Sequence, residues 1–411
     1  MPPDTPMFPR PLGISSVDNL TSVWIASRDA KSRPGSPGID RQTARKFSAR
    51  LNSNLESISR ELRTGRFHFS RLRPRLLLKP SGKFRLICVP TVKDRLVQRA
   101  IGRRLIANDR LGVVSPVSYG FVPGRKITDA INAAIQLRAE HQWVLKTDIQ
   151  SFFDRIQRGP LVERLRGKLG RSSLLPLLED VIRCDVKVTD SADQARISEL
   201  GIRAGIGLRQ GMPLSPLLSN FVLRKFDLAV QRCKFRMIRY ADDLIFFADS
   251  REEALDCLAF VVEELDKLHH EVPKLGEDSK TQLLPPRWPV EFLGVDISYS
   301  ASKGGYVAKV PGLVIEAIHD DIMKLADISA AMKNGKKFRD VCGRVVAVQN
   351  AYKGAYWYAE NWEHVEGQIR GACRSAIAKL LTEVFGVETI KRLSAEQKEF
   401  FGFDIPLETE E

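Results

Sequence analysis

The fold of this chain is decided by one stretch of sequence, Arg236-Met237-Ile238-Arg239-Tyr240-Ala241-Asp242-Asp243-Leu244-Ile245-Phe246-Phe247. Apolar and β-prone residues lie on both sides of Ala241-Asp242-Asp243, which is the pattern of a β-hairpin with two carboxylates at or beside its turn. Adjacent carboxylates repel each other and destabilise a partly buried site, so we expect a compensating group beside them. A hard divalent cation with oxygen ligands is the simplest such group.

A third acid, Asp148, stands at the end of another predicted strand, Trp143–Ile149. If that strand and the hairpin are neighbours in one sheet, Asp148 and Asp242 face the same space. Two Mg²⁺ ions about 3.5–4 Å apart could then lie between them, as in-line nucleotidyl transfer requires. An Asp-Asp pair alone is a weak sign of such a site, because turns are rich in aspartate.

A second predicted hairpin lies at residues 76–90, where two apolar runs flank a Pro-Ser-Gly-Lys turn. It brings three cations together, Lys79, Lys83 and Arg85. They are either a solvated hairpin tip or a binding site for a triphosphate.

Hydrophobic periodicity predicts the remaining elements. Residues 291–310 are predicted to form short strands, and residues 185–207 a hairpin or loop. The predicted helices before residue 311 are 46–70, 91–110, 125–140, 160–183, 217–230 and 252–269.

From Pro311 onward the chain is predicted to be helical. Three amphipathic helices are marked by apolar positions at residues 315–328, 338–348 and 369–384. The aromatic and basic run Tyr352–Tyr358 is placed between the last two helices, where it serves either helix packing or contact with a duplex backbone.

Composition restricts the function classes. The 411 residues include 64 Lys and Arg against 50 Asp and Glu, and the net charge of +14 favours a polyanionic partner, nucleic acid first and anionic membrane second. No apolar run approaches the roughly 18 residues of a membrane span, and the N-terminus lacks a signal-peptide pattern, so we expect a cytoplasmic protein. Six scattered cysteines without a CxxC pair speak against a zinc site or a disulfide framework.

The order of these segments resembles the reverse transcriptase family, in its bacterial group II intron-like branch. The resemblance covers about residues 30–385, and its most specific motifs are the YxDD and QGxPLSPxxSN sequences. The matching elements are Lys79-Pro80-Ser81-Gly82-Lys83-Phe84-Arg85 with Asp94–Gln98, Tyr119-Gly120-Phe121 with Gly124-Arg125, Asp148-Ile149-Gln150-Ser151-Phe152-Phe153-Asp154, Gln210–Asn220, Tyr240-Ala241-Asp242-Asp243, Ser279-Lys280-Thr281 and Phe292-Leu293-Gly294.

The resemblance implies an α+β right-hand polymerase with fingers, a palm built on an antiparallel sheet, and a helical thumb. The expected borders are an N-terminal extension at 1–45, fingers at 46–140, a palm at 141–310 with a fingers-like insertion at about 160–207, a thumb at 311–385 and a tail at 386–411. The loop near Gly35–Asp40 resembles the family's template-contacting N-terminal extension, and the thumb would hold the template–primer duplex through its backbone.

The resemblance also assigns metal ligands. Asp148 and Asp242 would bind two Mg²⁺ ions, the Ile149 carbonyl could be a further ligand, and Asp243 would be a supporting acid. Lys280 would lie near the pyrophosphate as a general acid, with a solvated surface lysine as the plain alternative.

The remaining roles concern the nucleotide. Lys79, Lys83 and Arg85 would bind the incoming triphosphate. Gln210 would contact the nucleotide, and Gly211 would let the backbone approach closely. Phe153 would be a steric gate that excludes a 2′-hydroxyl, although strand alternation sends one of Phe152 and Phe153 into the core.

The chain also departs from parts of the family. Residues 386–411 hold no Cys/His cluster, which disfavours intron mobility by target cleavage, and typical retron elements are not evident. We therefore expect a stand-alone enzyme that copies an RNA template, in antiviral defence with a dedicated structured non-coding RNA, while a retroelement or repair role stays open. The competing hypothesis is a maturase-like RNA-binding splicing cofactor without catalysis. The presence of Asp148, Asp242 and Asp243 disfavours it, because a protein that only binds RNA does not need three mutually repelling acids.

Overall fold

The Arg236–Phe247 stretch forms the predicted hairpin in the computed structural model, which describes residues 13–31, 35–78, 82, 84–107, 109–188 and 191–400. Strand β4 (Arg236–Tyr240) pairs antiparallel with β5 (Asp243–Ala248), and Tyr240 lies opposite Asp243. Ala241 and Asp242 are therefore the two turn residues, and Ala241 has a φ of 59°. Tight two-residue hairpin turns require such a left-handed residue because it matches the twist of the flanking strands.

The hairpin belongs to a four-stranded sheet in the order β4-β5-β3-β6, so β5 lies beside β3 (Trp143–Asp148). Strand β6 (Gln282–Leu284) covers the other edge of β3. Residues Leu244–Ala248 of β5 are all buried. A strand with neighbours at both edges and burial on both faces reads as a continuous apolar run rather than as an alternating one.

The chain divides into two compact units, one of residues 1–126 with 145–283 and the other of residues 127–144 with 284–411. Besides the four-stranded sheet, the first unit has an antiparallel hairpin of β1 (Arg73–Leu78) and β2 (Phe84–Val89). Its helices are α1 (Val17–Ala26), η1 (Arg28–Ala30), α2 (Ala44–Ser48), α3 (Leu51–Thr64), α4 (Val92–Ile106), α6 (Phe152–Arg155), α7 (Arg158–Leu169), α8 (Leu175–Arg183), α9 (Ser191–Glu199), α10 (Ser215–Arg232) and α11 (Arg251–Asp266).

The core of the first unit is built around α4 and α10, which are buried along most of their length. Helix α4 begins at a clear signal, because the Thr91 side chain accepts a hydrogen bond of 3.1 Å from the Asp94 backbone nitrogen. Helix α11 begins in the same way, with Ser250 accepting from the Glu253 nitrogen. These caps satisfy backbone donors that the first helical turn leaves unpaired.

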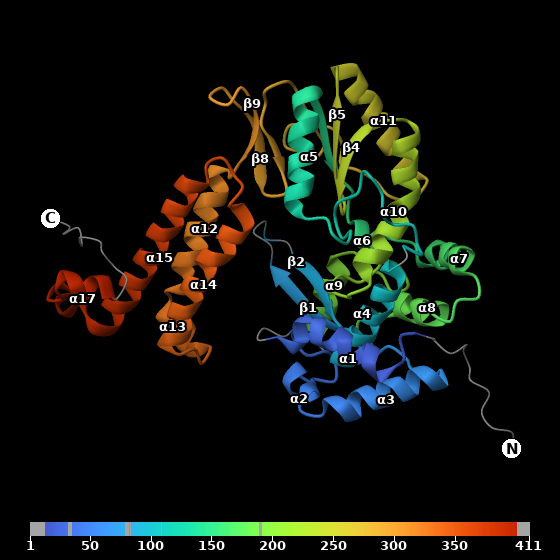
Figure 1. Cartoon of the computed structure of the whole chain (residues 1–411), viewed down its shortest axis with the longest axis horizontal. Coiled ribbons are helices and arrows are strands. Elements are labelled where there is room, and N and C mark those ends of the chain that lie inside the picture. The colour runs from blue at the N-terminus through green and yellow to red at the C-terminus, as the bar shows by residue number, and fades with distance from the viewer. Residues whose placement is uncertain are drawn as a thin grey trace. The chain divides into compact units, whose positions relative to one another are not determined.

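The second unit combines a helix, a small sheet and a helical bundle. Helix α5 (Ile127–Glu140) contacts the antiparallel sheet of β7 (Val290–Phe292), β8 (Val295–Ser300) and β9 (Gly305–Lys309). Helices α12, α14 and α15 pack against one another around a core of their own, and Figure 1 shows them side by side. The helices of this bundle and the segments near it are α12 (Gly312–Leu325), α13 (Ile328–Lys333), α14 (Phe338–Tyr356), α15 (Trp362–Phe385), α16 (Val387–Lys391) and α17 (Ala395–Phe400).

Helices and antiparallel sheets together confirm the expected α+β class. The predicted subdomain borders at residues 45, 140, 310 and 385 stay predictions. Among the described residues, no helix is long and apolar enough to cross a membrane.

Several local predictions were wrong. The predicted helix 160–183 is two helices, α7 and α8, and the predicted helix 46–70 is α2 followed by α3, which ends at Thr64. Residues 185–207 contain helix α9, whose sequence is mostly polar and in which Ile197 is the one buried residue among the described side chains. The helix predicted over 315–328 ends at Leu325, because Asp327 caps a new helix by accepting from the Ala330 nitrogen at 2.8 Å. Finally, Tyr352–Tyr356 lies inside α14 rather than between helices.

Candidate active site

Asp148 and Asp242 lie on neighbouring parts of one sheet, as the sequence predicts. Strand β3 ends at Asp148 and lies directly beside β5, which the Ala241-Asp242 turn precedes. The backbone nitrogen of Ile149 donates a hydrogen bond of 3.1 Å to the carbonyl oxygen of Asp242. The two acids are therefore presented by main-chain segments that are hydrogen-bonded to each other.

A cleft of about 760 Å³ opens at this point. Seven of the predicted site residues line it, namely Arg85, Asp148, Ile149, Phe153, Gln210, Asp242 and Lys280. Asp243 and Gly211 are described but do not line it, while Lys79 and Lys83 lie outside the described residues. The cleft is of the size that holds small ligands in proteins.

The carboxylates of the cleft are electrostatically strained. Burial raises the pKa of Asp242 above its ordinary value, and the nearby Asp148 raises it further. Burial, followed by the charges of Asp242 and Asp148, raises the pKa of Asp243 to about 6. The Lys280 ammonium forms an ion pair with Oδ2 of Asp148, and although partial burial lowers the pKa of Lys280, this contact makes the net direction upward.

The carboxylates of Asp148 and Asp242 suit a divalent cation whose other ligands come from water and substrate. Oδ1 of Asp148 is buried and has no hydrogen-bond partner, and Asp242 faces the same cleft. In the described part of the chain, no group of three or more His, Cys, Asp or Glu side chains is arranged to hold a metal by itself. Mg²⁺ is commonly bound through one or two carboxylates with water and substrate phosphates as the other ligands, so the acids present suit this ion.

The two adjacent phenylalanines differ in burial. Phe152 is 2% exposed and packs in the main core, whereas Phe153 is partly buried and packs against that core. The chain enters α6 at Ser151, which has a φ of 47°. Both residues line the cleft, and Phe153 is the more exposed of the two; its role as a steric gate stays a prediction.

Gln210 is placed by the tight approach of two backbones. Its carbonyl oxygen accepts a hydrogen bond of 2.7 Å from the Cys88 nitrogen of β2. The next residue, Gly211, has a φ of 103°, and a Cβ there would lie 2.5 Å from the Cys88 carbonyl oxygen. Glycine is therefore required at this position both by conformation and by space.

An ion-pair cluster holds the segment that leads to Gln210. Asp185 accepts hydrogen bonds from Arg158 at 2.8 Å and from Arg209 at 2.7 Å. Burial raises the pKa of Asp185, but these two guanidinium groups outweigh it and the net direction is downward. Sequence analysis did not single out this cluster, because its members are far apart in the sequence.

Helix α9 supplies a further cleft residue that the sequence prediction missed. Arg196 lines the cleft and lies over the Phe84 ring, with its guanidinium carbon 5.5 Å from the ring centre. Its side chain is exposed. The segment was predicted to be a hairpin or loop, so no face of it could be assigned to the cleft.

Sequence comparison now identifies the family. The sequence pattern described as "Reverse transcriptase (RNA-dependent DNA polymerase)" matches residues 77–297, which is more than half of the chain. The chain belongs to the reverse transcriptase family. This span includes the acids of the cleft and the Gln210-Gly211 turn.

The relatives of this reverse transcriptase family member include bacterial and intron-encoded proteins. It is 30% identical to Protein YkfC of Escherichia coli (strain K12) over 218 residues, which is 50% of this chain and 53% of YkfC. It is 24% identical to Group II intron-encoded protein LtrA of Lactococcus lactis over 264 residues, 64% of this chain and 40% of LtrA. The chain thus spans about half the length of YkfC and less of LtrA, and the resemblance to the group II intron-like branch is confirmed.

A structural likeness is also found. A solved structure of telomerase from Candida albicans has a TM-score of 0.44 to this chain, with 12% sequence identity over 80% of this chain and 65% of that chain.

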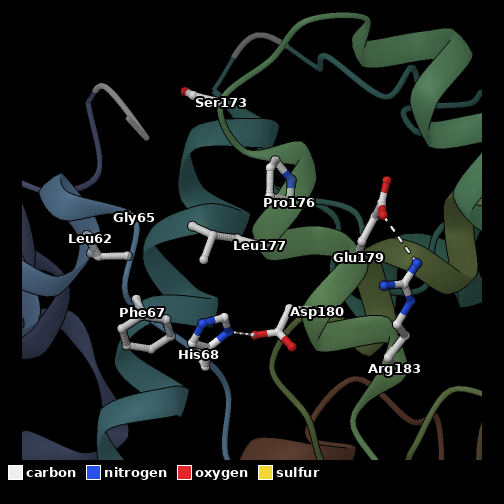
Figure 2. Close-up of a pocket in the computed structure, with 10 residues that line it drawn as sticks. All are labelled: Leu62, Gly65, Phe67, His68, Ser173, Pro176, Leu177, Glu179, Asp180 and Arg183. Carbon is white, nitrogen blue, oxygen red and sulfur yellow. Dashed lines mark hydrogen bonds and ion pairs between the residues drawn. The ribbon is translucent and has the colours of Figure 1, made fainter. Parts of the chain in front are cut away.

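A second, smaller cavity of about 200 Å³ lies between the end of α3, the segment after it, and α8 (Figure 2). Its polar side chains lie close to one another: His68 lies 3.7 Å from Asp180, and Arg183 lies 3.4 Å from Glu179. None of the predicted site residues that the structure describes lines it.

Proposed function

We propose that this protein is an RNA-directed DNA polymerase that adds deoxynucleotides to a primer in the larger cleft. The observation that carries the proposal is the convergence of Asp148 and Asp242 with Gln210 and Arg85 in one cleft of the first unit. Family membership supports the same activity. A binding protein without catalysis has no need to keep mutually repelling acids together.

Asp148 and Asp242 would hold two Mg²⁺ ions, with the Ile149 carbonyl as a further ligand and Asp243 as a supporting acid. When bound, the ions would activate the primer 3′-hydroxyl and stabilise the charge of the triphosphate and the leaving pyrophosphate. The buried, unpartnered Oδ1 of Asp148 supports this assignment, because such an atom is costly unless a cation or donor satisfies it.

The other residues would bind and orient the nucleotide. Arg85 would hold the triphosphate through its planar guanidinium, with Lys79 and Lys83 of the same hairpin beside it. Phe153 would lie under the sugar and exclude a 2′-hydroxyl, and Gln210 would contact the nucleotide. Lys280, which pairs with Asp148 in this structure, would be released toward the leaving group and donate a proton there.

Primer extension on poly(rA)/oligo(dT) with Mg²⁺ tests the activity. We expect Asp148→Ala and Asp242→Ala to abolish extension, and Asp243→Ala to reduce it strongly. The exposed Asp256 of α11 offers a matched control, since Asp256→Ala should extend like the wild-type protein. Extension that survives both Asp242→Ala and Asp243→Ala would contradict the metal assignment, whereas a wild-type protein that binds RNA without extending a primer would favour the maturase-like alternative.

The template that we propose is a structured non-coding RNA. The net charge of +14 suits a polyanionic partner, and the relatives include a retron reverse transcriptase of Myxococcus xanthus, 31% identical over 42% of this chain. Antiviral defence is the setting that we propose by analogy with other members of the family, and cytoplasmic location stays a prediction. Sequencing of the RNA and DNA that co-purify with the protein would identify the template, and a group II intron ribozyme around the gene would contradict the defence role.

A further inference from the structure

The turn that presents Asp242 is held by a buried arginine. Nη1 of Arg239 donates a hydrogen bond of 3.0 Å to the carbonyl oxygen of Ala241, the left-handed residue of the turn. Arg239 is 0% exposed. Its own main chain is fixed, because its nitrogen donates to the Val117 oxygen and its oxygen accepts from the Tyr119 nitrogen, both at 2.7 Å.

Helix α10 holds the guanidinium of Arg239 in turn. Nε and Nη2 donate to the two carboxylate oxygens of Asp227 at 2.7 and 2.6 Å. Nη1 also donates to Oδ1 of Asn220 at 3.0 Å, and the amide nitrogen of Asn220 donates to the Gly120 oxygen at 2.9 Å. Asp227 and Asn220 are 2% and 1% exposed, so the whole group is withdrawn from solvent.

The turn also has no free space on the side of Gly120. A Cβ added to Gly120 would clash with the backbone nitrogen of Ala241. The hydrogen bonds of Arg239 and this close approach therefore fix the turn from two directions.

We propose that Asp227, Arg239 and Asn220 form a positioning network that sets the Ala241-Asp242 turn and thereby places the Asp242 carboxylate beside Asp148. The inference rests on the proposed function, because it is metal binding by Asp242 that requires this placement. A buried ion pair is often replaceable by apolar residues without loss of stability, so what this pair contributes is the geometry of the turn. Lysine could not replace Arg239, because only a planar guanidinium reaches Asp227 in two places while donating to two further oxygens.

Two variants test the network. Asn220→Ala removes the side chain that accepts from Arg239 and donates to the Gly120 oxygen. Arg239→Lys keeps the positive charge but loses the two-point hydrogen bond of the guanidinium to Asp227. The matched control is Arg95→Lys, because Arg95 forms a similarly buried two-point pair with Asp29, at 2.9 and 3.0 Å, in another part of the first unit. Asp242→Asn serves as the control for metal binding.

The first readout is hydrogen exchange of backbone amides, which depends on neither metal nor activity. We expect both network variants to exchange faster within residues 143–150 and 236–248, including the Ile149 amide that donates to Asp242, while the parts of the first unit that do not contact the network keep their wild-type protection. Arg95→Lys should leave these two segments unchanged. Wild-type exchange in both segments of Asn220→Ala and Arg239→Lys would overturn the proposal.

The second readout is Mn²⁺ binding measured by electron paramagnetic resonance, with Mn²⁺ as the only added ligand. Loss of an outer hydrogen-bond partner commonly weakens metal binding about tenfold or more, and we expect a loss on the order of tenfold in both network variants. Affinity equal to wild type, together with unchanged exchange, contradicts the network. If Asp242→Asn binds Mn²⁺ as tightly as wild type, the proposed function fails, and the exchange measurement still decides the network.

Discussion

The hydroxyl oxygens of Thr147 and Thr281 lie 2.7 Å apart and are both buried. Each threonine stands next to a charged residue of the cleft, Asp148 after Thr147 and Lys280 before Thr281. The hydrogen bond therefore fixes the two chains at the point where the Lys280 ammonium meets the Asp148 carboxylate. The threonine pair therefore helps to hold the Lys280 ammonium beside the Asp148 carboxylate.

Replacement of this lysine should slow chemistry rather than binding. We expect Lys280→Ala to lower kcat by on the order of 10²-fold with little change in the KM for dNTP, because a positioned general acid typically contributes that much or more. Single-turnover incorporation measures the effect, and the exposed Lys274 of the preceding loop is the control, as Lys274→Ala should behave like wild type. A rise in KM with unchanged kcat would make Lys280 a binding residue instead.

A methyl group at Gly211 should displace the Gln210 turn. The added Cβ would lie 2.5 Å from the Cys88 carbonyl oxygen, and displacements of about 1 Å at a reacting site can cost on the order of 10²-fold in rate. We expect Gly211→Ala to lower kcat/KM by about that factor. The control is Gly167→Ala in α7, where the Cβ meets open space, and thermal unfolding should show it to be up to about 1 kcal/mol more stable than wild type. Near-normal activity of Gly211→Ala would mean that β2 and the turn can separate freely.

Sugar selection should depend on Phe153. We expect Phe153→Val to raise incorporation of ribonucleotides relative to deoxynucleotides by about tenfold, equivalent to about 1.4 kcal/mol of discrimination. Competition between rGTP and dGTP on one template measures the ratio. Phe152→Ala serves as contrast, since removal of this 2% exposed ring should cost about 3–5 kcal/mol of stability without a specific change in sugar preference. Unchanged selectivity in Phe153→Val would move the gate elsewhere.

The arginine from α9 should contribute modestly to nucleotide binding. Arg196 is exposed at the cleft, so screening by solvent limits a phosphate contact to about 0.5–1 kcal/mol, and we expect Arg196→Ala to raise the KM for dNTP about two- to fivefold with kcat unchanged. Arg171→Ala, which changes an exposed arginine beyond the cleft lining, should keep the wild-type KM. Equal KM values for both variants would exclude Arg196 from the nucleotide site.

Acid should destabilise the first unit through His270. Burial, followed by the charges of Arg155 and His269, lowers the pKa of His270 to about 4, and neither ring nitrogen has a hydrogen-bond partner. In the unfolded chain His270 takes up a proton near pH 6.5, whereas in the folded chain its ring stays neutral down to about pH 4. The contribution of neutral His270 to the free energy of unfolding is therefore present above pH 6.5 and is lost as the pH falls toward 4.

The replacement His270→Leu should remove this dependence. Between pH 7.5 and pH 5 we expect the variant to lose about 2 kcal/mol less unfolding free energy than wild type in urea titrations. The exposed His364 of α15 gives the control, because His364→Leu should follow the wild-type curve. Parallel curves for wild type and His270→Leu would show that His270 can be protonated in the folded state.

Local sequence patterns were sufficient for much of the fold and for the identity of the acids. The hairpin around Ala241-Asp242 could be predicted because strand propensity and turn preference depend on residues that are neighbours in sequence. The apolar run Leu244–Ala248 likewise indicates a buried strand. Helix α9 could not be predicted, because Ile197 is the one buried residue among its described side chains and gives no periodic signal.

The sequence by itself determined which carboxylates this protein keeps and which strand and turn carry them. Only the tertiary structure decided that β5 lies beside β3, that Arg239 holds the left-handed Ala241, and that α9 brings Arg196 to the cleft. The physical reason is that pairing of strands, burial of a guanidinium and the lining of a cleft depend on residues distant in the chain. Such contacts form only when the whole unit packs, so they cannot be predicted from a local pattern of side chains.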